Sequence, residues 1–186
     1  MSVDPAQFAR LRAIAEQLPQ VPGIGKIEIS NDTIVMMMSP VKRHELAVIR
    51  IARQLNDQLP QTHPGHLAHG GADLVDPVRG RLRNPDIMVF HEEALNDEEA
   101  ALLPHQVLLV VEVVSASNPE NDYLTKVRDY AAMGIPTYLL VDPRKGTGIV
   151  HDEPEYARRE HFAFGDTVTV GPWTLDTGVL RTYSAG

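Results

Sequence analysis

The chain has 186 residues, of which 43% are hydrophobic and 23% charged, and its formal net charge is −8. This composition is ordinary for one globular domain, and the absence of cysteine excludes disulfides, thiolate metal sites and cysteine nucleophiles. The negative charge argues against a general basic surface for nucleic acid, and the lack of a signal-peptide pattern or an apolar run of membrane-spanning length predicts a cytoplasmic protein.

The first third of the chain is expected to form a helix, a hairpin and a second helix. Apolar residues at helical spacing predict a helix over 5–18. Two short strands, 26–30 and 33–38, have the pattern of a β-hairpin. A second amphipathic helix is expected from about residue 39 to 59, and a loop over 61–71, which is rich in His, Gly and Pro.

Strands and helices alternate in the remainder. The predicted strands are 72–75, 87–90, 107–114 and 137–141, and the predicted helices are an acidic stretch over 92–103 and a segment over 122–133. Two or three antiparallel strands are expected from residue 148 on. The strand over 107–114 is apolar on both faces, as expected of a central strand covered by helices. The pattern predicts a single α/β domain, with a mixed sheet flanked by helices.

Two carboxylates lie in or beside these apolar strands. Asp86 stands at the entrance of the strand 87–90, and Glu112 lies inside 107–114 among valines. A buried carboxylate is costly unless a positive group compensates it, so the pair indicates a bound metal ion. For Asp86 alone the alternative is turn chemistry, because a Pro-Asp pair at a strand entrance is common.

A lysine could complete such a site. The simplest place is two residues after Glu112 on the same strand face, but position 114 is Val. Lys126 could fill the same volume if its helix packs back over the strand. Asp122 and Lys126 are also four residues apart, so an exposed surface ion pair is the alternative for Lys126.

The order of these motifs resembles the Uma2 family, restriction-endonuclease-like proteins with the PD-(D/E)XK nuclease fold. The matching stretches are Met38-Ser39-Pro40, His44, Arg83-Asn84-Pro85-Asp86, Glu112-Val113-Val114-Ser115, Asp122, Lys126, Tyr130, Gly134-Ile135-Pro136 and Tyr138-Leu139-Leu140-Val141-Asp142-Pro143. The resemblance covers about residues 25–183, which leaves 1–22 as an N-terminal helical extension.

The resemblance implies a metal-dependent endonuclease that uses Mg²⁺ or Mn²⁺ to hydrolyse DNA. It implies that Asp86, Glu112 and the main-chain carbonyl of Val113 ligate the metal, and that Lys126 helps to orient the attacking water. The accessory candidates are His44, Glu45 and Asp122. Glu45 has a simpler explanation, because an acid in the first turn of a helix is stabilised by the helix dipole.

Two other functions stay open at this point. The chain could be a non-catalytic binding or assembly module that keeps the fold, which the missing lysine at position 114 favours, or a metal-dependent hydrolase of another phosphate ester. The apolar C-terminal region, with Val168, Val170 and Trp173, could form a sheet edge or face that needs covering. We therefore also expect a homodimer.

Overall fold

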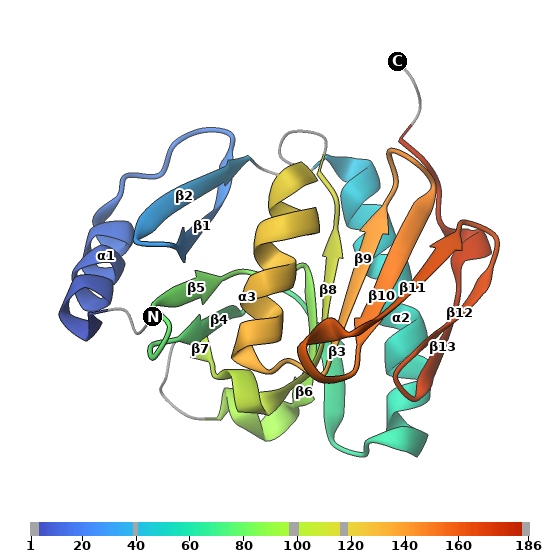
Figure 1. The fold of residues 1–186 in the computed structure, drawn as a ribbon. Coiled ribbons are helices and arrows are strands. Elements are labelled where there is room, and N and C mark those ends of the chain that lie inside the picture. The colour runs from blue at the N-terminus through green and yellow to red at the C-terminus, as the bar shows by residue number, and fades with distance from the viewer. Residues whose placement is uncertain (1–3, 39–40, 97–100, 116–118, 184–186) are drawn as a thin grey trace.

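The computed structural model describes residues 4–38, 41–96, 101–115 and 119–183. Within these residues two sheets form the frame of the molecule (Figure 1). The first sheet has the order β2-β1-β5-β4-β7, with β1 (Ile24–Ser30), β2 (Thr33–Met38), β4 (Asp73–Asp76), β5 (Arg81–Arg83) and β7 (Ala101–Leu102). The second has the order β11-β10-β9-β8-β6-β3, with β3 (His66–His69), β6 (Ile87–His91), β8 (Val107–Val113), β9 (Thr137–Asp142), β10 (Thr147–Asp152) and β11 (Arg158–Ala163).

In the described residues, three α-helices and a separate hairpin surround the sheets. The helices are α1 (Pro5–Gln17), α2 (Lys42–Thr62) and α3 (Lys126–Met133), and the hairpin joins β12 (Thr167–Val170) to β13 (Trp173–Asp176). A π-helical turn (Asn121–Thr125) leads directly into α3. The structure confirms the predicted combination of mixed sheet and flanking helices, but its strands form two main sheets where a single sheet was predicted. No helix in the described part of the chain is both long and apolar enough to cross a membrane.

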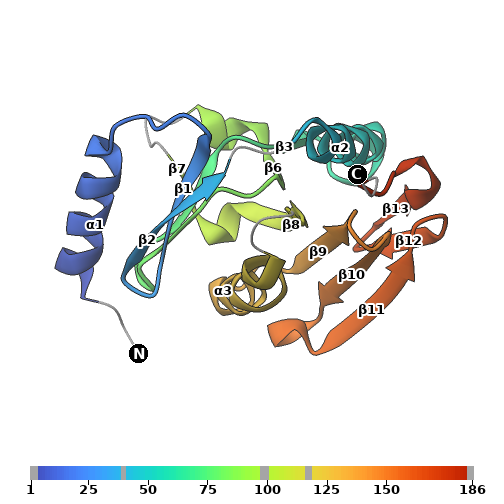
Figure 2. The ribbon, with the colours of Figure 1, turned by 90° about the horizontal axis from the view of Figure 1, so that it is seen from above.

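Strand β8 lies in the middle of the second sheet, parallel to β9 and antiparallel to β6. Helix α2 covers one face of this sheet and α3 the other, as the view from above shows (Figure 2). Successive residues of β8 point to opposite faces, so Leu109 and Val111 pack in the α2 core while Val110 packs in the α3 core. Glu112 shares the parity of Val110, and this places its carboxylate on the α3 side.

Helix α1 packs on the first sheet, away from α2 and α3. Phe8 and Ala15 of the helix contact Ile29, Val75 and Leu82 in a small buried cluster. Asp4 begins the helix as an N-cap, because its side chain accepts a hydrogen bond from the Ala6 amide. The predicted N-terminal helix is therefore confirmed, and it completes the core of the first sheet.

Helix α2 continues past the point where the sequence predicted its end. Pro60 lies inside the last turn, the helix ends at Thr62, and β3 occupies part of the predicted loop 61–71. The loop prediction was wrong because tertiary contacts outweigh the helix-breaking tendency of proline here. Leu59 is fully buried, and Thr62 Oγ1 accepts a hydrogen bond of 2.9 Å from the indole of Trp173.

The predicted acidic helix over 92–103 is also wrong in the described residues. A short 3₁₀ turn covers Glu92–Leu95, and β7 pairs in parallel with β4; residues 97–100 lie outside the described part. Leu102 is buried in the α3 core and pairs with Leu74 of β4, and this pairing requires extended backbone. The short strand β5 was not predicted. The predicted helix over 122–133 and the strand over 137–141 are confirmed.

The C-terminal part forms four antiparallel strands, where two or three were predicted. Val168, Val170 and Trp173 are buried in the α2 core, so they do not form an open apolar face. The free edge of β13 is covered by α2: Gln54 exchanges hydrogen bonds with the backbone of Asp176, and Gln58 does the same with Thr174. The feature on which we based a homodimer is therefore covered within the chain.

Candidate functional site

Asp86 connects three elements at the entrance of β6. Its Oδ1 lies 2.6 Å from Lys26 Nζ of β1, while Oδ2 accepts a 2.8 Å hydrogen bond from the Val113 amide of β8 and lies 3.1 Å from His44 Nε2 of α2. Burial by itself would raise the pKa of this carboxyl, but the hydrogen bond with His44 and the charge of Lys26 hold the pKa well below its usual range. Asp86 is therefore an anion at neutral pH.

Glu112 is almost fully buried, at 2% exposure, on the α3 side of β8. Its Oε1 accepts a 2.6 Å hydrogen bond from the Tyr130 hydroxyl, and Oε2 lies 2.9 Å from Lys126 Nζ. Burial raises the pKa of Glu112 to about 7, and the nearby carboxylates of Asp86 and Asp122 add to the rise despite the opposing charge of Lys126. The surroundings of Glu112 thus compensate a negative charge incompletely.

Lys126 begins α3 and points back over β8. Its Nζ lies 3.1 Å from Asp122 Oδ1 and 3.6 Å from Glu28 Oε1, in addition to Glu112. The exposed surface pair, which was the alternative for Lys126 and Asp122, is wrong, because both side chains are buried. Burial alone would lower the pKa of Lys126, but the surrounding carboxylates raise it well above its ordinary value, so the group is an ammonium.

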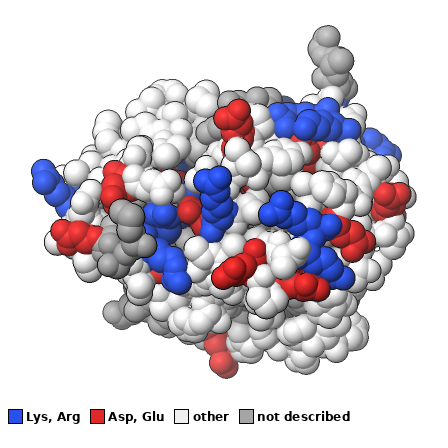
Figure 3. Space-filling view, in the orientation of Figure 1, with Lys and Arg blue, Asp and Glu red and all other residues white. Residues whose placement is uncertain are grey.

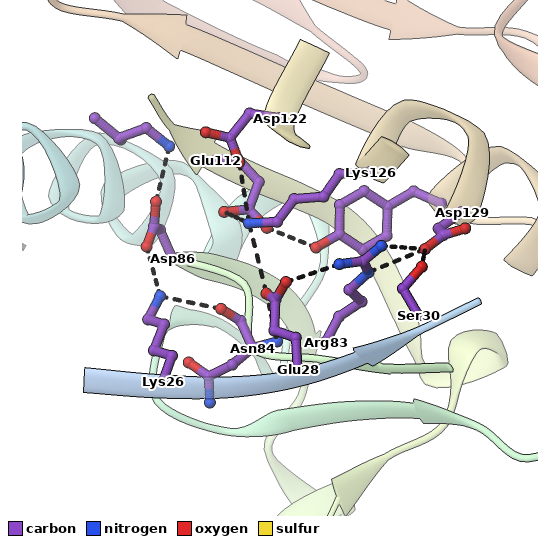
Figure 4. Close-up of polar contacts among 12 residues, drawn as sticks. Lys26, Glu28, Ser30, Arg83, Asn84, Asp86, Glu112, Asp122, Lys126 and Asp129 are labelled. Atoms are coloured by element: carbon purple, nitrogen blue, oxygen red, sulfur yellow. Dashed lines mark hydrogen bonds and ion pairs between the residues drawn. The ribbon is translucent and has the colours of Figure 1, made fainter. Parts of the chain in front are cut away.

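Strand β1 supplies a polar face that the sequence analysis missed. Lys26, Glu28 and Ser30 alternate with Ile27 and Ile29, so the three polar side chains point to one side (Figure 4). They contact Asp86, Arg83 and Asp129 respectively. The pairing of β1 with β2 is irregular between Ile24 and Lys26, and such bulges often redirect a side chain toward a site.

Arg83 lies behind this face and is completely buried. Its Nη1 donates to Glu28 Oε2 at 2.7 Å, and its Nε donates to Asp129 Oδ2 at 3.1 Å. Burial alone would lower the pKa of Arg83, but Glu28 and Asp129 raise it above its ordinary value. Ser30 and Arg81 also donate to Asp129. This network fixes β1 and β5 of the first sheet to α3, and thereby holds Glu28 beside Lys126.

Of the two accessory candidates on α2, the structure brings in His44 and leaves out Glu45. His44 is buried against Asp86, and although burial alone would lower its pKa, the hydrogen bond with Asp86 raises it. The side chain of Glu45 is 52% exposed, and its Oε1 lies 3.6 Å from His44 Nδ1 on the outer side. Its position in the first turn of α2 fits the helix-dipole explanation.

These side chains line one pocket between the two sheets. The lining residues are Lys26, Glu28, Met37, Met38, His44, Asp86, Glu112, Val113, Ser115, Asp122 and Lys126. Asp86, Glu112, Val113, Asp122, Lys126 and His44 were all candidates from the sequence. The pocket is open to solvent on one side, where Lys26 keeps 25% of its side chain exposed.

The donor set fits a hard divalent cation, which prefers carboxylate oxygens. Asp86 is anionic and could bind a cation directly. Glu112 has a pKa raised to about 7, and a cation beside it would favour its ionised form. Across the described residues, however, no three acidic or histidine side chains form a ready metal cage. Lys26 and Lys126 stand against the carboxylates instead, so a metal ion would have to share or replace these contacts.

The fold is restriction-endonuclease-like, and its pocket brings carboxylates and a lysine together. The family model Uma2, described as "Putative restriction endonuclease", matches residues 13–177. The chain belongs to the Uma2 family. Its structure resembles that of "a putative nuclease belonging to DUF820" from Anabaena variabilis, with a TM-score of 0.66 and 15% identity over 90% of this chain and 92% of that chain. A search of curated proteins found no match.

Proposed function

We propose that the chain is a metal-dependent endonuclease that hydrolyses DNA phosphodiester bonds. The observation that carries this proposal is the meeting of Asp86, Glu112 and Lys126 in one pocket, with the pKa of Glu112 raised to about 7. A strongly perturbed carboxyl in a cleft is typical of a functional site. Membership of a family described as "Putative restriction endonuclease" supports the nuclease class.

In this proposal Asp86, Glu112 and the main-chain carbonyl of Val113 hold Mg²⁺ or Mn²⁺. When bound, the metal would supply an activated water and neutralise charge on the scissile phosphate. Lys126 would help to orient the attacking water and would stabilise the negative charge that develops on the phosphate oxygens. Asp122 holds Lys126 from the preceding turn, and His44 fixes the orientation of Asp86 through Oδ2.

DNA would meet a local site and not a broad basic field. The net charge is −8, and acidic and basic side chains are interspersed on the face that Figure 3 shows. Long-range electrostatic attraction is therefore weak, and local contacts with the metal and its neighbouring lysines must supply the binding. A homodimer, which would present one site to each strand of a duplex, stays a prediction.

The test is cleavage of supercoiled plasmid, single-stranded circular DNA and branched DNA in Mg²⁺ or Mn²⁺. We expect the wild type to cut at least one of these substrates and EDTA to stop it. Glu112→Gln should lose activity by about 100-fold or more, because the substitution removes the charge of the ligand while the side chain keeps nearly the same shape. Glu160→Gln, an acid-to-amide change on the exposed strand β11, is the matched control and should keep full activity. Equal cleavage by wild type and Glu112→Gln would contradict the proposal.

One observation favours a second candidate, a non-catalytic binding module. Lys26 lies 2.6 Å from Asp86 Oδ1 and Lys126 lies 2.9 Å from Glu112 Oε2, so each carboxylate has a lysine partner, as expected of a site that does no chemistry. This candidate predicts that folded wild-type protein binds neither Mg²⁺ nor Mn²⁺ in calorimetry and leaves all three substrates intact.

A further inference from the structure

Lys26 occupies a position in the pocket that neither the sequence motifs nor the family resemblance assigns. Its Nζ lies 2.6 Å from Asp86 Oδ1 and donates to the main-chain carbonyl of Asn84 at 3.0 Å. The irregular pairing after Ile24 and the alternation of β1 bring this side chain to the pocket (Figure 4). The contact is therefore built into the backbone of β1.

The two oxygens of Asp86 are not equivalent. Oδ2 is held by the Val113 amide and lies against His44, both parts of the buried frame. Oδ1 contacts only Lys26 in the described part of the chain. Divalent cations bind carboxylate oxygens at about 2.0–2.6 Å, so an ion on Oδ1 would stand where the ammonium now stands. The two cations cannot occupy this position together.

The two lysines of the pocket differ in how firmly they are held. Lys126 is 4% exposed and has three carboxylate neighbours: Glu28, Glu112 and Asp122. The side chain of Lys26 is 25% exposed and has one carboxylate neighbour. Lys26 can therefore leave by rotating toward solvent, whereas Lys126 would have to break three buried ion pairs.

We infer that Lys26 is a displaceable internal cation, which holds the metal position at Asp86 Oδ1 and is driven toward the mouth of the pocket when a divalent ion binds. This inference rests on the proposed metal-dependent function and adds a competition to it. A doubly charged ion interacts with Asp86 more strongly than an ammonium does, so an abundant metal ion displaces Lys26 from Asp86 Oδ1. When the metal is scarce, Lys26 keeps the carboxylate neutralised.

The first test follows the accessibility of Lys26 in the wild-type protein. Lysines are acetylated briefly with an amine-reactive ester, with and without saturating Mn²⁺, and the modification of each lysine is measured by mass spectrometry. We expect Lys26 to react several-fold faster in Mn²⁺, while Lys42, which is exposed on α2, reacts equally in both. An unchanged or slower reaction of Lys26 in a protein that binds Mn²⁺ would overturn the inference and leave the proposed function intact.

The second test measures Mn²⁺ affinity by calorimetry in four proteins: wild type, Lys26→Met, Lys42→Met and Asp86→Asn. Without the competing ammonium, Lys26→Met should bind Mn²⁺ about tenfold more tightly than wild type. Lys42→Met removes the same charge outside the pocket and should match the wild type, and Asp86→Asn should bind poorly. Equal or weaker binding by Lys26→Met would overturn the inference.

The remaining outcomes separate the inference from the proposed function. Binding of Mn²⁺ by Lys26→Met alone would support the competition and overturn metal-dependent activity of the wild type. Binding by none of the four proteins would overturn both. Cleavage plays no part in either measurement, so a failure to find a DNA substrate does not decide the inference.

Discussion

The fold disfavours the ionised form of Glu112. Its pKa is raised to about 7 by burial first and by neighbouring carboxylates second. A folded-state pKa above the unfolded value of 4.5 means that the folded protein binds this proton more tightly than the unfolded chain does. The contribution of Glu112 to stability is therefore greatest near and below pH 4.5 and is lost as the pH rises toward 7.

This sign leads to a prediction for the metal-free protein. In EDTA, the stability of Glu112→Gln relative to wild type should increase between pH 5 and pH 8, by on the order of 1–3 kcal/mol. The amide keeps the size of the side chain and cannot ionise. Chemical denaturation at the two pH values measures the difference, with Glu160→Gln as the control for an acid-to-amide change. A difference between Glu112→Gln and wild type that stays constant or decreases with pH would show that Glu112 ionises freely in the folded protein.

At this scale the sequence was informative about some site residues and silent about others. Glu112 was predicted because an acid among five valines and two leucines is conspicuous, and Asp86 because it precedes a buried strand. Lys26 and Glu28 alternate with apolar residues in a hairpin, which is also the pattern of an ordinary strand with one solvated face. Their approach to Asp86 and Arg83 depends on how the two sheets meet, and no local pattern carries that information.

At the scale of elements, two glutamines of α2 form the backbone hydrogen bonds of β13 that a neighbouring strand would otherwise form. Gln54 and Gln58 are four residues apart on the helix, while Asp176 and Thr174 are two apart on the strand, and both spacings bring the pairs into register. Each glutamine amide donates to a strand carbonyl and accepts from the amide of the same residue. The exposed edge of the hairpin is thereby satisfied within the chain.

Removal of these amides should loosen the hairpin locally. In the double variant Gln54→Ala and Gln58→Ala, we expect faster hydrogen exchange at the backbone amides of Thr174 and Asp176, because their hydrogen-bond acceptors are lost. Gln61→Ala, one turn further along the same helix, is the matched control and should leave both amides protected. Mass spectrometry or NMR measures the exchange. Unchanged protection of both amides in the double variant would contradict the assignment.

The sequence located α2 but not its last turn, because Pro60 is a strong local signal for an end. In the fold, the burial of Leu59 and the hydrogen bond between Thr62 and Trp173, 111 positions later, stabilise the helical turn that contains Pro60. The acidic segment 92–103 failed for a related reason: its composition suits a helix, whereas the pairing of Leu102 with Leu74 is a contact between distant parts of the chain. Local propensity is a weak guide where distant contacts decide.

For the whole molecule, Arg83 forms a buried electrostatic connection between the first sheet and helix α3. It lies on β5 of the first sheet, and it binds Glu28 of β1 and Asp129 of α3, which packs on the second sheet. Its side chain is fully buried, so water cannot replace a lost partner. Removal of the guanidinium would leave Lys126 as the counter-charge of Glu28 and Arg81 as that of Asp129, and the carboxylate oxygens that Arg83 bound would lose their buried donors.

We therefore expect Arg83→Met to lower the free energy of unfolding by about 3–5 kcal/mol. Arg12→Met is the control, since Arg12 forms an i,i+4 ion pair with Glu16 on the surface of α1, and it should cost no more than about 1 kcal/mol. Urea denaturation at neutral pH measures both variants. Similar costs for the two substitutions would mean that Arg83 does not hold the sheets together.

The polar face of β1 also limits how this protein can change over evolutionary time. Insertion or deletion of one residue before Lys26 would turn Ile27 and Ile29 toward the pocket, and Lys26, Glu28 and Ser30 toward the core of the first sheet. The pocket would lose its polar side chains, and the core of the first sheet would receive buried charges. Substitutions in β1 can be explored one position at a time, whereas changes in its length cannot. A mutant library of this hairpin should therefore vary residue identity and keep the number of residues fixed.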